Sequence, residues 1–126
     1  ACAAANAVLD VIEEEGLIDR AEAIGARLEQ RWTAMQAGVA KGLFGDVRRV
    51  GAMAAVELVT EGDATKPNSD ACAAILGSAR EKGLIMLSAG KKAHVVRTHV
   101  PLVATDAQVD EGLDIMEEAV TEYLKG

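Results

Sequence analysis

One arginine of this sequence stands in a setting that suits the binding of a carboxylate. Arg97 lies in the middle of the run 94–100, whose branched apolar residues predict a strand. Arginine is seldom buried without a partner, and its planar guanidinium grips a carboxylate through two parallel hydrogen bonds. Two interpretations stay open from this pattern alone: a site for the carboxylate of a small molecule, or an internal ion pair with one of the 20 acidic residues.

The histidines and cysteines offer little chemistry. His94 and His99 are five residues apart on the predicted strand, and an odd spacing sends them to opposite faces. We therefore expect them to face solvent or a partner, without sharing a metal ion or a proton. Cys2 and Cys72 each stand among alanines on predicted helices, which indicates small buried hydrophobic residues. Two such cysteines form neither a disulfide framework nor a metal site, so a reducing, cytoplasmic location is expected.

No lysine has the setting of a nucleophile that forms a Schiff base. Such a lysine needs desolvation or a cationic neighbour to lower its pKa. The candidates lie in predicted loops, turns or helix ends: Lys41, Lys66, Lys82, Lys91, Lys92 and Lys125. The acidic residues sit on helix faces or helix ends, where solvation is their ordinary role. We therefore assign this chain no catalytic, cofactor-binding or metal-binding residue.

Length and composition fit one domain that spans residues 1–126. The mass is 13.1 kDa, half of the residues are hydrophobic and 26% are charged, as in ordinary globular domains. A net charge of −7 and an aromatic content of 2% argue against nucleic-acid binding. The acidic balance also argues against an anionic membrane surface. The longest apolar run, 50–56, is far shorter than the roughly 20 residues of a membrane-spanning helix.

Apolar periodicity and capping signals predict four helices. The first covers residues 1–15 and ends before Gly16, and the second begins near Asp19, which forms a possible capping box with Glu22. The third is capped by Ser69 or Asp70 and ends before Gly83. The last follows a full capping box, Thr105 to Gln108. Inward-facing positions on the last three helices are predicted at these residues: Ala21, Ile24, Leu28, Trp32, Met35, Cys72, Ile75, Leu76, Ala79, Val109, Leu113, Met116, Val120 and Leu124.

The strands are expected between these helices. Residues 47–59 predict a strand or a bent pair of strands, 84–87 a short buried strand and 94–100 a further strand. The composition of 62–68 predicts a loop. Short turns between strands, with helices at both ends of the chain, predict an α+β fold: a two-layer sandwich of a small, mostly antiparallel sheet covered by helices.

Three segments resemble the class III, pyridoxal-phosphate-dependent aminotransferases, and among them the 4-aminobutyrate aminotransferases. The first segment is 45–53 together with 56–58. The second is 81–90, which resembles the family's "KGLILLSCG" stretch. The third is 95–102 together with 105–108, which resembles "V-[IL]-R-x-x-x-P-L … D-x-Q". The resemblance covers essentially the whole chain, and the order and spacing of the segments make it specific. It implies the small C-terminal domain of fold type I pyridoxal-phosphate enzymes.

The resemblance also implies an activity for a longer parent protein. That enzyme moves an amino group from 4-aminobutyrate or a similar ω-amino acid to 2-oxoglutarate, through a pyridoxamine intermediate. Arg97 matches the arginine that pairs with the α-carboxylate of glutamate or 2-oxoglutarate. The family's aldimine lysine and other residues that hold pyridoxal phosphate lie in a large domain outside this chain. The implied partners are this large domain, a further copy of the parent in a homo-oligomer, and small carboxylate substrates.

We therefore expect residues 1–126 to be a piece of a longer protein, inactive by itself. The first residues, 1–9, read as helix interior with no capping residue ahead of them, which supports that expectation. We also expect the alanine-rich first helix to expose an apolar face that meets the large domain.

The chain departs from the family at three places. Arg49 replaces a common glycine, Ala89 replaces a common cysteine, and 91–94 replaces an aromatic or asparagine-rich segment near the active-site mouth. Two alternatives to the enzyme remain: a non-catalytic α+β module that binds a small carboxylate or a protein partner, and a structural domain in which Arg97 closes an internal ion pair.

Overall fold

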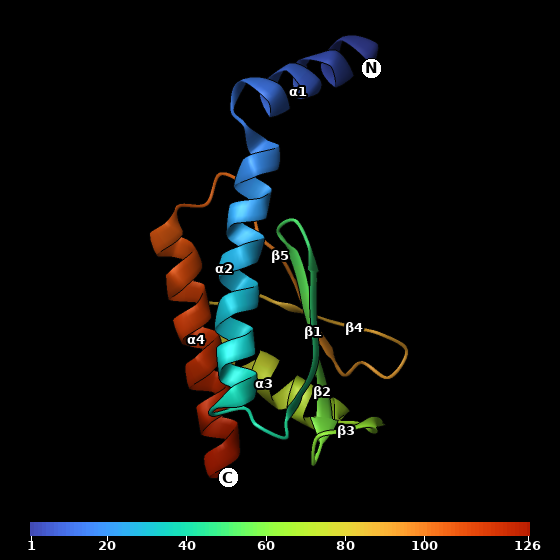
Figure 1. Cartoon of the computed structure of the whole chain (residues 1–126), viewed down its shortest axis with the longest axis vertical. Helices are drawn as coiled ribbons and strands as arrows, with labels where there is room; N and C mark the ends of the chain where they lie inside the picture. Colours follow the sequence, from blue (N-terminus) through green and yellow to red (C-terminus); the bar gives the residue numbers. More distant parts are fainter.

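The computed structural model describes residues 1–126, and its helices and strands form a two-layer arrangement (Figure 1). The helices are α1 (Cys2–Glu14), α2 (Leu17–Ala37), α3 (Ser69–Glu81) and α4 (Asp106–Lys125). The strands are β1 (Phe44–Val50), β2 (Met53–Thr60), β3 (Asp63–Pro67), β4 (Leu87–Ala89) and β5 (Val95–His99).

The strands form one antiparallel sheet in the order β1-β2-β5-β4, with β3 paired to β2 beside this path. Strand β5 therefore lies between β2 and β4, although β2 and β5 are far apart in the sequence. In register, Ala55 of β2 stands opposite Arg97 of β5, and Leu87 of β4 stands opposite Arg97 on the other side. This topology places Arg97 in the interior of the sheet.

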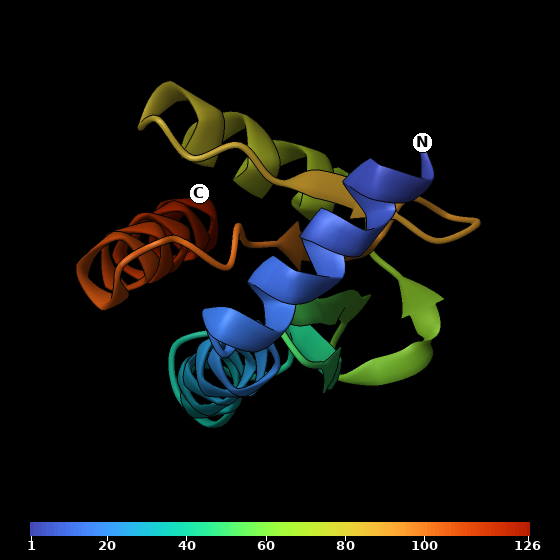
Figure 2. The ribbon, with the colours of Figure 1, turned by 90° about the horizontal axis from the view of Figure 1, so that it is seen from above.

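Helices α2 and α3 pack on one face of the sheet, α4 packs against these two helices, and no helix packs on the other face (Figure 2). On the covered face, Ala54, Val56 and Leu58 of β2 and Val96 of β5 are fully buried in a single core cluster. The opposite face keeps exposed residues. The predicted α+β sandwich with a small antiparallel sheet is therefore confirmed.

Most of the helix residues that were predicted to face inward are buried in the core. The buried positions on α2, α3 and α4 are Ile24, Leu28, Trp32, Met35, Cys72, Ile75, Ala79, Val109, Leu113, Met116 and Val120. Ala21 and Leu76 are half-buried. Leu124 was expected on the same stripe but is 46% exposed, because the last turn of α4 extends past its neighbours.

The predicted capping box of the last helix and the predicted helix-ending glycines are present in the structure. Thr105 accepts a hydrogen bond from the Gln108 backbone, and the Gln108 side chain accepts one from the Thr105 backbone, so the capping box is confirmed. Gly16 and Gly83 follow their helices with φ values of +61° and +95°, as helix-ending glycines do.

Two predicted caps are wrong. Helix α2 begins at Leu17, directly after the left-handed Gly16, with no side-chain cap, so Asp19 already lies inside the helix. Helix α3 is capped by Asn68, whose side-chain oxygen accepts from the Ala71 backbone at 3.0 Å. Asparagine is as good a cap as serine or aspartate, and the local sequence does not rank three adjacent candidates.

Two strand predictions also need correction. The segment 62–68, expected as a loop, contains β3, which forms because its backbone pairs with β2. The strand expected at 84–87 is displaced to Leu87–Ala89, since only these residues come into register with β5. Leu84 and Met86 pack against the core ahead of it. The segment 47–59 belongs to an antiparallel pair, one of the two predicted alternatives.

Helix α1 contacts only α2 and contains no buried residue (Figure 1). Val8, Leu9 and Val11 are 58%, 63% and 43% exposed. The expected exposed apolar face on the first helix is therefore present. None of the four helices has the length and apolar character needed to cross a membrane.

Candidate functional site

Arg97 stands on the face of the sheet that the helices leave uncovered. The strand register aligns Arg48, Ala55, Arg97 and Leu87 in one row across β1, β2, β5 and β4. Arg97 and Leu87 are exposed, whereas Val96, the preceding residue of β5, is fully buried on the opposite face. The alternation of a strand thus sends the guanidinium of Arg97 outward while its backbone is fixed between two neighbouring strands.

Arg97 forms no ion pair and no side-chain hydrogen bond within the chain, which sets it apart from most of the other arginines. Arg20, Arg27, Arg31, Arg48 and Arg49 each pair with one or two carboxylates. The interpretation of Arg97 as half of an internal ion pair is therefore wrong. Its five donors remain available to a group from outside these residues.

The acidic residue closest in register to Arg97 is Glu57, and its carboxylate is paired with another arginine. Glu57 lies on the same sheet face, two residues from Ala55 along β2. Its carboxylate accepts a hydrogen bond from Arg48 at 2.9 Å, and Arg48 also donates to Asp46 at 2.6 Å. These two carboxylates, Asp46 foremost, raise the pKa of Arg48 above its ordinary value. Because both acids are paired with Arg48, the guanidinium of Arg97 has no paired counter-ion on this face.

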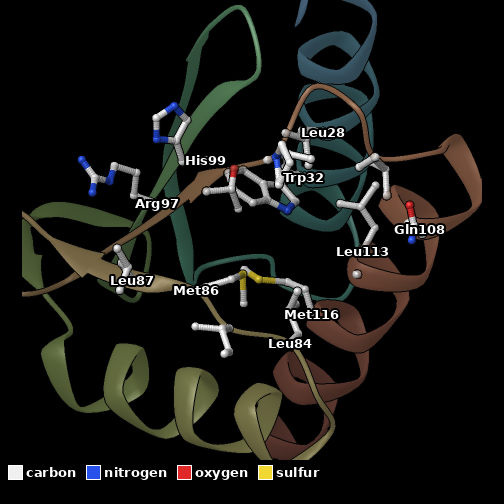
Figure 3. Close-up of a pocket in the computed structure, with 17 residues that line it drawn as sticks. Leu28, Trp32, Leu84, Met86, Leu87, Arg97, His99, Gln108, Leu113 and Met116 are labelled. Atoms are coloured by element: carbon white, nitrogen blue, oxygen red, sulfur yellow. The ribbon is translucent and has the colours of Figure 1, made fainter. Parts of the chain in front are cut away.

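A mainly apolar cavity of about 390 Å³ adjoins Arg97. Figure 3 shows the cavity between the ends of β4 and β5 and helices α2 and α4. Trp32, Leu113 and Met116 line its interior, while Arg97 and His99 stand at its edge. The Trp32 indole Nε1–H is buried and has no hydrogen-bond partner. The sequence did not predict this cavity, because residues from four separate elements form it.

The two histidines occupy different settings. Strand β5 begins at Val95, so His94 precedes it, and the prediction that both histidines lie on the strand is wrong. His94 is half-buried beside Gly90, with its Nδ1 buried and without a partner. His99 is exposed at the end of β5, on the same face as Arg97.

The cysteines also differ from one another. Cys72 is fully buried in α3, as predicted, and burial raises the pKa of its thiol. Cys2 is exposed, which contradicts the prediction, because no element packs on its side of α1. The buried thiol of Cys72 is therefore not a reactive thiolate of the kind that a cationic neighbour produces.

The lysines of this chain do not fit the site of a covalently held pyridoxal phosphate. Lys82 lies 2.9 Å from both Glu118 and Glu122, and these carboxylates, Glu122 foremost, raise the pKa of its ammonium. A Schiff-base lysine requires the opposite shift. The remaining lysines are exposed: Lys41, Lys66, Lys91, Lys92 and Lys125.

Arg49 fastens the β1–β2 hairpin to α2. Its side chain donates to Glu29 and Glu22 of α2, at 2.8 Å each. The turn glycine Gly51, with a φ of +53°, lies against Gly25 of the same helix. Arg49 thus ties the strand pair to the helical layer.

Comparison with known proteins identifies the family. A family model for class III aminotransferases matches residues 1–120. The chain is 48% identical over 122 residues to a 5-aminovalerate aminotransferase of Pseudomonas putida, which covers 97% of this chain. It is 42% identical over 122 residues to the 4-aminobutyrate aminotransferase GabT of Escherichia coli, again over 97% of the chain. The chain spans 28% of the length of each of these relatives.

Solved structures agree with the sequence comparison. The fold matches an aminotransferase of Bacillus anthracis with a TM-score of 0.84 and 25% identity, over 96% of this chain and 28% of that one. It matches a transaminase from a study of ancestral reconstruction with a TM-score of 0.77 and 37% identity, over 98% of this chain and 27% of that one. The chain belongs to the class III aminotransferases.

Proposed function

We propose that residues 1–126 form the small C-terminal domain of a longer pyridoxal-phosphate-dependent aminotransferase. In this proposal the parent enzyme moves an amino group from 4-aminobutyrate or a similar ω-amino acid to 2-oxoglutarate. The names of the relatives, which include 4-aminobutyrate and 5-aminovalerate, support an ω-amino acid as the donor. The cofactor supplies the electron sink of the reaction and is held by residues outside this chain.

The observation that carries the proposal is the unpaired Arg97 in the interior of the uncovered sheet face. A guanidinium whose backbone is fixed by two neighbouring strands binds a carboxylate at a defined place and orientation. Both 2-oxoglutarate and its product glutamate carry an α-carboxylate that Arg97 is proposed to bind. The remainder of the enzyme, on this proposal, covers the same face and brings the reacting atoms to it.

The surface around Arg97 supports a covered face rather than one that remains in water. Val50, Met53 and Leu87 on this side of the sheet are 76%, 45% and 55% exposed. Ile85, next to the edge strand, is 76% exposed. Clustered apolar side chains of this kind mark surfaces that meet another body. Homo-oligomer formation by the parent and a cytoplasmic location stay predictions.

Replacement of Arg97 tests the proposed role in the complete enzyme. We expect Arg97→Gln to raise the KM for 2-oxoglutarate by about tenfold to a hundredfold, because it removes a charge-assisted pair of hydrogen bonds. The half-reaction with 4-aminobutyrate, whose amino end carries no α-carboxylate, should change far less. Steady-state and single-turnover kinetics of each half-reaction measure the two effects.

Arg80→Gln is the matched control, since Arg80 is exposed on α3 and forms no ion pair. An unchanged KM for 2-oxoglutarate in Arg97→Gln would contradict the role of Arg97. The reading frame gives a separate test of the domain assignment: upstream coding sequence for a domain with a strand-borne lysine supports it, and a start codon directly ahead of Ala1 contradicts it.

A further inference from the structure

We propose that His99 forms, together with Arg97, a two-residue site for the α-carboxylate of the substrate. The inference rests on the proposed function of Arg97 and extends it to a second residue. The aminotransferase motif that includes Arg97 leaves the position of His99 unspecified. His99 is therefore proposed as a binding residue outside that motif, and it makes carboxylate binding depend on a proton.

The two side chains share one face of β5. Residues 97 and 99 alternate with Val96, which is fully buried, and with Thr98, whose hydroxyl donates to the backbone of Ala54 at 3.4 Å. Side chains two residues apart on a strand stand on the same face, about 7 Å apart. In Figure 3 Arg97 and His99 leave the strand on the same side. The long guanidinium arm and the imidazole can thus both reach one carboxylate above the sheet.

The fold itself does not require a histidine at this position. His99 is exposed, stands opposite Met53 of β2, and forms no hydrogen bond or ion pair within the chain. Met53 in turn stands opposite Val50 of β1, so the row in which His99 lies is otherwise apolar. Because the imidazole of His99 forms no polar contact within the chain, it is available to a ligand.

The charged groups on the face of His99 are one unpaired cation and one cluster of paired charges. On β5 itself the facing group is Arg97. From β2 and β1 come Glu57, Arg48 and Asp46, and both acids are paired with Arg48. Strand β4 brings no ionisable residue, and α3 packs on the opposite face of the sheet.

These charges couple carboxylate binding to a proton. A carboxylate bound beside an imidazole favours the protonated ring, so binding of the carboxylate is coupled to the uptake of a proton. Because imidazolium is lost as the pH rises, the affinity for the carboxylate is expected to fall over the same range.

The test uses the complete enzyme and 2-oxoglutarate as the probe. With wild type, we expect the KM for 2-oxoglutarate to increase as the pH is raised from about 6 to about 9, through the range in which imidazoles titrate. With His99→Gln, we expect a KM about fivefold higher at the acid end and nearly independent of pH, with kcat little changed. A merely structural role would alter stability or kcat without removing the pH dependence.

Calorimetry supplies a second measurement that does not depend on turnover. Binding of 2-oxoglutarate, titrated in buffers of low and high ionisation enthalpy, should show proton uptake by wild type and less uptake by His99→Gln. Arg80→Gln is the matched control, because Arg80 is exposed on α3, which packs on the opposite face of the sheet. It should retain both the proton uptake and the pH profile of wild type.

The outcomes separate this inference from the proposed function. If Arg97→Gln raises the KM and His99→Gln leaves both the KM and the proton uptake unchanged, the inference is overturned and the proposed function stands. If neither variant affects the KM, both fail. His99→Leu serves as a second variant, since an apolar side chain suits the row of Val50 and Met53. A stable His99→Leu enzyme with a pH-independent KM supports the inference.

Discussion

At Gly25, helix α2 touches the backbone of the β1–β2 turn, and this contact fixes the position of the strands that carry the site. A Cβ atom at Gly25 would lie 1.8 Å from the carbonyl oxygen of Gly51. The backbone of the turn must move to admit any side chain there. Helix propensity alone favours alanine over glycine by about 1 kcal/mol, so the contact, and not the helix, explains this residue.

We expect Gly25→Ala to lower the free energy of unfolding by about 3 kcal/mol, because overpacking against a backbone atom forces the hairpin away from the helix. Urea-induced unfolding of the 126-residue chain, followed by the fluorescence of its single tryptophan, Trp32, measures the change. Gly77→Ala in α3 is the matched control. A Cβ there meets nothing within 4 Å, so this variant should be as stable as wild type or slightly more stable. Equal stabilities of the two variants would refute the argument.

At the scale of elements, ion pairs join α2 to α4 along their length. Arg20 and Arg27 pair with Asp106, Arg27 also pairs with Asp110, and Arg31 pairs with Asp114 and Glu117. The arginines all lie on α2 and the acids all lie on α4. Exposed pairs contribute little one by one, but a network of this kind fixes the register of two packed helices.

The network gives stability a pH dependence with a defined sign. The hydrogen bond from Arg20, followed by the charge of Arg27, lowers the pKa of Asp106 below its ordinary value of 3.8. A carboxyl group whose folded-state pKa is lowered stabilises the fold fully above that ordinary value. Its contribution is lost as the pH falls from 3.8 through the lower folded-state pKa. Asp106→Asn should therefore destabilise the protein at neutral pH, and the difference from wild type should shrink in acid.

Chemical denaturation at a series of pH values between about 7 and about 3 measures this effect. Asp70→Asn is the matched control, because Asp70 also occupies the first turn of its helix but forms no ion pair. It therefore shares any interaction with the helix dipole. If the two variants show the same dependence on pH, the ion pairs of Asp106 are not its cause.

At the scale of the whole molecule, α1 projects from the rest of the structure (Figure 1). Its apolar side chains are exposed. We expect the 126-residue chain by itself to associate through this helix, because Val8 and Leu9 are more than half exposed and adjacent. The sedimentation coefficient should rise with concentration, and the double variant Val8→Ser/Leu9→Ser should abolish the rise. Val103→Ser, which removes an isolated valine that is 77% exposed, should retain it. A strictly monomeric wild type would contradict this expectation.

The sequence by itself determined the features that depend on neighbours in the chain. The buried stripes of α2, α3 and α4, the capping box at Thr105 and the helix-ending Gly16 and Gly83 are local patterns, so their periodicity and residue types suffice. The three motifs of the family are local as well. They were enough to identify the class III aminotransferases, with Arg97 as the candidate site residue.

Only the tertiary structure decided the features that depend on register between distant segments. Strand β3 exists because β2 offers it a partner, and β4 occupies residues 87–89 because these meet β5. Whether Arg97 had an internal counter-ion depended on Glu57, which Arg48 holds from a third strand. The place of His94 ahead of the strand depended on the true start of β5. In each case the observed structure is stabilised by backbone pairing or by charge interactions between residues that are remote in sequence. Local propensity depends only on neighbouring residues and therefore cannot predict these interactions.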